Sequence, residues 1–135
     1  MLYLHDHEVR QVRLNQPHPV NVTPSWYGDS VGHYEGGALV IDTVGVKRGH
    51  YPMLDMYGTP FSDALHVVER YTRTSPDVIS YEATITDPSV FTRPWKISMP
   101  LYRRQEKNEQ LLEFKCTEFV EELMYGQWRK NPLPR

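Results

Sequence analysis

The pair Gly36-Gly37, set between two strand-like segments, is the feature that most constrains the fold of this chain. Residues 30–35 and 38–44 on either side of the pair carry β-branched and aromatic residues, which favour strands. Adjacent glycines can adopt the positive φ angles that a tight two-residue turn requires. The pattern therefore predicts a β-hairpin.

Two further hairpins are predicted downstream. Residues 64–73 and 78–86 alternate between apolar and polar side chains and flank a turn that contains Pro76. Residues 95–103 and 110–118 alternate in the same way. Successive hairpins predict an antiparallel sheet, and they do not indicate a particular reaction.

The chain as a whole therefore predicts an all-β fold. With about seven or eight short strands, we expect an antiparallel up-and-down (lipocalin-like) barrel or a strongly curled sheet. Val120, Leu123 and Met124 follow at helical spacing and predict a short C-terminal helix. We expect residues 1–128 to form a single β-barrel domain, and residues 129–135 to form a flexible tail.

The remaining segments predict an edge strand and two loops. Residues 7–14 alternate briefly between polar and apolar side chains, which is typical of a short edge strand. Prolines recur through residues 15–25, so that segment should be an extended loop. Residues 46–60 are rich in glycine, proline and aromatic residues and predict a long loop.

Charge and cysteine content exclude several classes of function. Lysine plus arginine total 15 against 17 acidic residues, a formal net charge of -2, so we expect no nucleic-acid partner. A single cysteine, Cys116, excludes an internal disulfide and a thiolate metal cluster within one chain. Its predicted position beside Phe114 on the inward face favours a small buried apolar residue over a nucleophile.

Membrane and export signals are also missing from the sequence. Apolar runs fall short of the ~20 residues that a membrane-spanning helix needs. The N-terminal residues lack the basic region and apolar stretch of a secretion signal. We therefore expect no membrane association, and either a cytoplasmic protein or a mature or trimmed form of a longer one.

Several spaced sequence blocks carry a resemblance to a known family. They are GDSVG at 28–32, YEG at 34–36, LVIDT at 39–43, SDALHVVER at 62–70, TITDP at 84–88 and TRPW at 92–95. With these blocks, residues 9–116 resemble a large uncharacterised family of bacterial proteins. Its members are commonly longer and exported, and the family has no established activity. The resemblance thus implies a shared fold and adds little about function.

Aromatic residues near strand ends and in the long loops suggest a ligand site. Loops at a barrel mouth carry ligand contacts more often than strands do, and flat rings suit an apolar molecule or a sugar. Our leading hypothesis is a small-molecule-binding barrel with an aromatic-lined pocket. An ordinary core with aromatic plugs at the barrel ends is the alternative interpretation. The candidate ligand-binding residues are Trp26, Tyr34, His50, Tyr51, Trp95 and Arg103.

A cofactor-independent lyase, isomerase or hydrolase is the second hypothesis. Glu69 falls on the same strand face as Val67 and Tyr71, and a carboxylate in an apolar interior can exchange protons near neutral pH. Glu69 or His66 would act as acid or base, with Tyr81 as a hydrogen-bond donor. An ion pair between Glu69 and an arginine such as Arg103 is the structural alternative.

The other polar candidates have weaker motifs. His5 and His7 would project from one face of a strand, and His50 could approach His66, but no recognised metal-binding spacing is present. We therefore expect neither a metal nor another cofactor. Asp29-Ser30 and Ser62-Asp63 lack a nucleophile-elbow motif, and short polar residues at a strand start usually cap a turn.

A third class of function is an interaction module. The predicted helix over 120–124 and the nearby Trp128 would then cover a second copy of the chain. An exposed apolar row of this kind, paired across a two-fold axis, would produce a homodimer.

Overall fold

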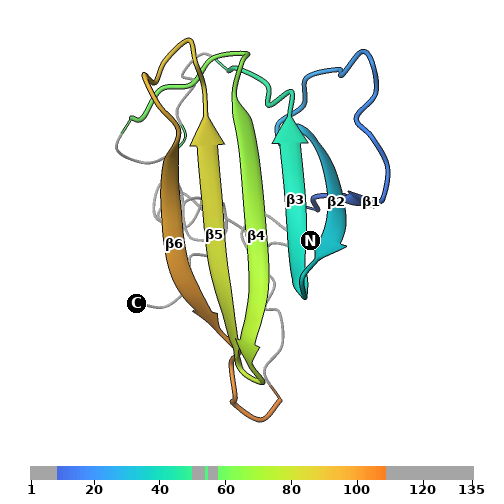
Figure 1. Cartoon of the computed structure of the whole chain (residues 1–135), viewed down its shortest axis with the longest axis vertical. Helices are drawn as coiled ribbons and strands as arrows, with labels where there is room; N and C mark the ends of the chain where they lie inside the picture. The colour runs from blue at the N-terminus through green and yellow to red at the C-terminus, as the bar shows by residue number, and fades with distance from the viewer. Residues whose placement is uncertain (1–8, 50–53, 55–57, 109–135) are drawn as a thin grey trace, which may run out of the picture. The chain divides into compact units, whose positions relative to one another are not determined.

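One six-stranded β-sheet organises the chain (Figure 1). The computed structural model describes residues 9–49, 54 and 58–108. The strands are β1 (Arg13–Leu14), β2 (Asp29–Glu35), β3 (Ala38–Val44), β4 (His66–Ser75), β5 (Val78–Thr86) and β6 (Trp95–Tyr102). They lie in the sheet in the same order as in the sequence. β1 runs parallel to β2, and every later neighbour is antiparallel.

The predicted hairpins are confirmed between β2 and β3 and between β4 and β5. Gly36 and Gly37 have φ angles of 55° and 80°, the left-handed values that a two-residue turn needs. The turn between β4 and β5 follows a register shift between Arg73 and Ser75, which marks a bulge.

The sheet is open, so the expectation of a closed barrel is wrong for the residues described. Within them β1 pairs only with β2, and β6 pairs only with β5. Within the described residues 9–14 of the predicted edge strand, only Arg13–Leu14 forms a strand, β1. The predicted strand at 110–118 and the predicted helix at 120–124 lie outside the described residues.

The contacts of the chain divide it into two compact units. The whole sheet belongs to the unit Gln11–Glu106, and the other unit consists of Met1–Arg10 and Lys107–Arg135. The fold and the sites described below are those of Gln11–Glu106. The predicted domain at 1–128 and the predicted tail at 129–135 stay predictions.

The register sorts the side chains of the sheet onto two faces, because cross-strand partners project to the same side. Ile41 pairs with Glu69 and Glu69 with Ala83, whereas Val68 pairs with Asp42 and with Thr84. The core face carries Ile41, Thr43, Val67, Glu69, Tyr71, Tyr81, Ala83, Ile85 and Trp95. The polar face carries Val40, Asp42, His66, Val68, Arg70, Glu82, Thr84 and Lys96.

The core face packs against the loops that enter β4 and β6. Phe61 and Leu65 are buried together with Ala83 and Ile85 of β5. Trp95 packs against this cluster and meets the Phe91 ring edge-on at 5.7 Å. Apolar burial on this side holds the sheet in place and leaves its opposite face to polar groups.

Asp87 joins two loops at the end of β5. Its side chain is 1% exposed and accepts hydrogen bonds from the Ser62 amide at 2.5 Å, the Ser62 hydroxyl at 2.7 Å and the Ser89 amide at 3.1 Å. Burial alone would raise the pKa of Asp87, but the bonds from Ser62, Ser89 and Val90 outweigh it and lower that pKa. The SDALHVVER and TITDP blocks are thus bonded to each other.

We expect Asp87→Asn to lower the free energy of unfolding by about 2 kcal/mol, because the new amide N–H would face donors that need an acceptor. Asp63→Asn is the matched control, since the Asp63 side chain is 81% exposed. In the wild type the contribution of Asp87 should be present above pH 3.8 and be lost as the pH falls through its lowered pKa. Urea unfolding measures both effects, and equal costs for the two variants would contradict this role.

Candidate functional site

A line of hydrogen-bonded side chains crosses the polar face of the sheet. Asp42 of β3 lies at its centre and receives a different histidine on each carboxylate oxygen. His18 Nε2 lies 2.9 Å from Asp42 Oδ1, and His66 Nε2 lies 2.8 Å from Asp42 Oδ2. The line continues from His18 to Asp29 and from Asp29 to Arg13.

His18 uses both ring nitrogens on carboxylates. Its Nδ1 lies 2.7 Å from Asp29 Oδ1, in addition to the contact of its Nε2 with Asp42. An ionised carboxylate only accepts hydrogen bonds, so both ring nitrogens must carry protons to satisfy this geometry. Burial lowers the pKa of His18, but the hydrogen bonds and charges of Asp29 and Asp42 outweigh it, and the net pKa is raised above 6.5.

His18 also fixes the loop between β1 and β2 to the sheet. The loop is long and contains three prolines, and His18 lies between two of them. A ring held between β2 and β3 by two charged hydrogen bonds gives this loop a defined position. The sequence pattern predicted only an extended loop here.

Asp29 is a partner of charged groups rather than the turn cap that was predicted. Its Oδ1 accepts from Arg13 Nη2 at 2.6 Å and from His18. Gly28 precedes it with a φ angle of 66°, and a Cβ at Gly28 would lie 2.5 Å from the Val44 carbonyl oxygen. The turn that leads into β2 therefore needs glycine at position 28, and this turn places Asp29 at the start of β2. Ser30, also predicted to cap the turn, is instead buried and bonded to Thr43 across the core face.

His66 occupies the other end of the line. Because Asp42 Oδ2 can only accept, the Nε2 of His66 donates and its Nδ1 is the nitrogen with a lone pair. In the described part of the chain nothing is bonded to that Nδ1, and the side chain is 41% exposed. The arrangement leaves a proton-accepting nitrogen facing outward and a carboxylate behind it.

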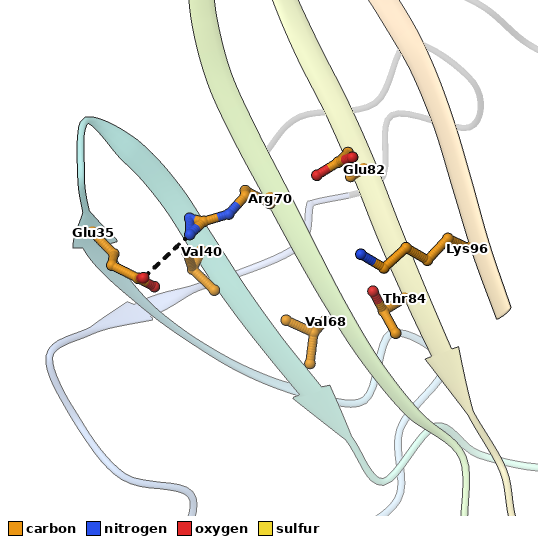
Figure 2. Close-up of a pocket in the computed structure, with 7 residues that line it drawn as sticks. All are labelled: Glu35, Val40, Val68, Arg70, Glu82, Thr84 and Lys96. Carbon is orange, nitrogen blue, oxygen red and sulfur yellow. Dashed lines mark ion pairs between the residues drawn. The ribbon is translucent and has the colours of Figure 1, made fainter. Parts of the chain in front are cut away.

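A pocket of about 180 Å³ lies on the same face (Figure 2). Val40 and Val68 form an aliphatic floor, and charged side chains surround it. The Arg70 guanidinium pairs with Glu35 at 3.2 Å. Lys96 extends from β6 above Thr84 and toward β4. The pocket is lined by Glu35, Val40, Val68, Arg70, Glu82, Thr84 and Lys96.

Two charges of this pocket are uncompensated. Among the residues that the structure describes, neither Lys96 nor Glu82 makes an ion pair or a hydrogen bond through its side chain. Arg70 and Glu35 neutralise each other. An ammonium group beside an aliphatic floor, with no carboxylate in contact, can receive an anionic group of a small molecule.

The predicted acid–base residues are divided between the two faces. Glu69 is buried on the core face, where the hydroxyls of Tyr71 and Tyr81 donate to its Oε1 at 3.0 and 3.1 Å. His66 projects to the polar face, three residues earlier on the same strand. The structure thus brings Glu69 and Tyr81 together and separates both from His66. Arg103, the arginine named for an ion pair with Glu69, is 72% exposed and contacts Asp77 at 3.9 Å instead, and an ion pair of Glu69 with another arginine stays a prediction.

The predicted ligand-binding residues do not gather in one place. Trp26 is exposed in the loop before β2, where it stacks with the ammonium of Lys47 at 5.3 Å. Tyr34 is exposed near the β2–β3 turn. Trp95 begins β6 at the other end of the sheet, measured along the strand direction. Arg103 lines another pocket, of about 340 Å³, beside the β4–β5 turn. His50 and Tyr51 lie outside the described residues.

The remaining sequence hypotheses concern a metal site, a cysteine and an interaction surface. His5, His7, Cys116 and Trp128 lie outside the described residues. Within the described ranges, no three His, Cys, Asp or Glu side chains are arranged to hold a metal ion. His18, Asp29, Asp42 and His66 bond to one another in a line instead of pointing at a common centre.

The sequence analysis singled out His66 but missed its partners in the polar line, Asp42 and His18, and all the residues that line the pocket. Asp42 carried one usable signal, because it is a carboxylate in the middle of the apolar strand 38–44. A charge in such a strand needs a partner, and that need points to the histidines. His18 carried no comparable signal, since nothing in a proline-rich loop shows where it folds back.

Comparisons with protein families, curated proteins and solved structures found no match to this chain. The resemblance to an uncharacterised bacterial family therefore stays a prediction. Among the residues described, we find no helix with the length and apolar character of a membrane span.

We expect the stability of the wild type to fall as the pH rises through the raised pKa of His18, because its two charged hydrogen bonds are complete below pH 6.5. His18→Gln should cost about 2 kcal/mol at pH 6 and should flatten this pH dependence. Urea unfolding between pH 5.5 and 8.5 measures the effect.

The exposed His33 provides the control for this prediction, because His33→Gln should keep the slope of the wild type. An unchanged slope in His18→Gln would show that His18 is not the titrating group.

Proposed function

We propose that this protein binds a small carboxylate-containing molecule in the pocket of the polar face. One observation carries the proposal: the Lys96 ammonium shares a pocket with the aliphatic side chains of Val40 and Val68 and has no ion pair in the described residues. A carboxylate bound to Lys96 would supply the missing counter-charge, and the carbon skeleton would cover the two valines.

The remaining lining groups support the same ligand class. Thr84 lies beneath Lys96 and its hydroxyl can donate to a carboxylate oxygen. Glu82 is on the neighbouring strand and would favour a ligand that also carries a hydrogen-bond donor or an ammonium group. The rigid sheet holds these groups in fixed positions, which lowers the entropic cost of binding.

The proposal keeps small-molecule binding and changes the expected ligand chemistry. Sequence patterning favoured an aromatic-lined pocket for an apolar or sugar-like molecule, but the lining of the polar-face pocket is aliphatic and charged. The larger pocket near Arg103 is a weaker candidate, because Arg103 there is already paired with Asp77. A homodimeric function stays a prediction, since the residues behind it lie outside the described ranges.

Glutarate and its uncharged diamide, glutaramide, test this proposal. We expect glutarate to shift the backbone amide signals of β3 to β6 in an NMR titration, and glutaramide to bind at least several-fold more weakly. Lys96→Met should weaken glutarate binding roughly tenfold, the effect of losing one charged hydrogen bond.

Lys47→Met is the matched control, because Lys47 stacks on Trp26 away from the pocket. The proposal fails if glutarate leaves the amide signals of β3 to β6 unchanged. It also fails if Lys96→Met and Lys47→Met weaken glutarate binding equally.

A further inference from the structure

We propose that His66 is a general base that, backed by Asp42, hydrolyses small carboxylic esters bearing an anionic group. The choice of substrate class rests on the proposed function, since the anionic group is the part that Lys96 would hold. The catalytic inference goes beyond binding, because it assigns to His66, on the polar face, the removal of a proton from water.

The orientation of His66 is the first argument. A catalytic histidine needs one ring nitrogen fixed by an acceptor and the other presented to the reactants. Asp42 Oδ2 accepts from His66 Nε2 at 2.8 Å, which leaves Nδ1 as the basic nitrogen on a side chain that is 41% exposed. The same carboxylate would stabilise the imidazolium that forms when Nδ1 takes a proton.

The support behind Asp42 is the second argument. His18 Nε2 holds the other oxygen of Asp42 at 2.9 Å, and Asp29 holds His18 in turn. The carboxylate therefore cannot rotate without breaking a second charged hydrogen bond. A base oriented by a third group that is itself fixed is the arrangement expected of a proton-transfer site. Asp42 and His18 are positioning residues in this scheme.

The position of the pair beside the pocket is the third argument. His66 and Val68 are two residues apart on β4, and Asp42 and Val40 are two residues apart on β3. Residues two apart on a strand share a face and are separated by about 7 Å along it. A ligand of a few carbon atoms that extends from Lys96 past Thr84 to Val68 would therefore end about 7 Å along β4 from His66.

The reaction needs only water as a second reactant. His66 Nδ1 takes one proton from a water molecule while the water oxygen attacks the ester carbonyl carbon. The tetrahedral intermediate then expels the alkoxide or phenoxide as its C–O bond breaks. The proton on His66 passes to the leaving group or to solvent, which restores the neutral ring.

Two activated esters test the proposal on the full chain: 4-nitrophenyl acetate, which is neutral, and mono(4-nitrophenyl) glutarate, which carries a carboxylate. Release of 4-nitrophenolate gives the rate. We expect the wild type to hydrolyse both faster than buffer does, and His66→Gln to lower kcat at least tenfold. His33→Gln should keep the wild-type rate, because His33 is an exposed histidine on β2, two strands away from His66.

Separate effects on kcat and on KM distinguish a catalytic role of the Asp42–His66 pair from a structural one. The groups around His66 on this face are Asp42 on β3, His18 behind Asp42 and the non-titrating Thr86 opposite on β5. Asp42→Asn should lower kcat for both esters with little change in KM, because the carboxylate that orients His66 through its Nε2 is gone. Amide NMR spectra of each variant confirm that the fold is retained.

Failure of this inference is distinguishable from failure of the proposed binding function. Lys96→Met should raise KM for the anionic ester more than for the neutral one, whereas His66→Gln should act on kcat for both. Equal kcat values in His66→Gln and the wild type would overturn the catalytic inference even if Lys96→Met raises KM. A loss in His33→Gln as large as that in His66→Gln would also overturn it, because exposed imidazoles would then explain the rate.

Discussion

The register between β3 and β4 is the constraint on which the rest of this structure depends. It pairs Asp42 with Val68, and so places the Asp42 carboxylate diagonally beside His66, two residues earlier on β4. A shift of one residue would move every side chain of a strand to the other face of the sheet. Asp42 would then lie on the core face of the sheet, and Ile41 would lie on the polar face. Burial of Ile41, which is fully enclosed, fixes the register that positions the polar line.

Electrostatic balance explains why a polar line can persist on a partly exposed face. Arg13, Asp29, His18 and Asp42 alternate in charge when His18 is protonated, so each charge lies next to the opposite one. An exposed ion pair alone contributes little to the free energy of unfolding. In a connected series in which both His18 nitrogens are hydrogen-bonded, each member is restrained by its neighbours. The restraint keeps Asp42 in the orientation that His66 needs. Lys96 is not part of this series of charges, and its uncompensated charge is the reason for proposing that it binds the carboxylate of a ligand.

The sequence predicted the strands well and the site poorly, for different physical reasons. The alternation in β3 to β6 and the Gly36-Gly37 turn are local signals, and the structure confirms those strands within one or two residues. His66 and Glu69 are three residues apart on β4, and residues an odd number apart on a strand project to opposite faces, so the two side chains could not share one site. The contacts of His18 with Asp29 and Asp42 span a proline-rich loop, and no local pattern encodes where such a loop returns. Barrel closure likewise depends on edge pairings between distant segments, which alternation does not specify.

Protonation of the two histidine rings tests the central claim most directly, because Asp42 is claimed to hold both of them. Long-range 1H–15N NMR correlations report which ring nitrogens carry protons in the full chain at pH 6, below the raised pKa of His18. The account predicts that His18 is protonated on both nitrogens and that His66 bears its proton on Nε2, with each of these N–H groups bonded to a carboxylate. A neutral His18, or a His66 ring with its proton on Nδ1 alone, would contradict it.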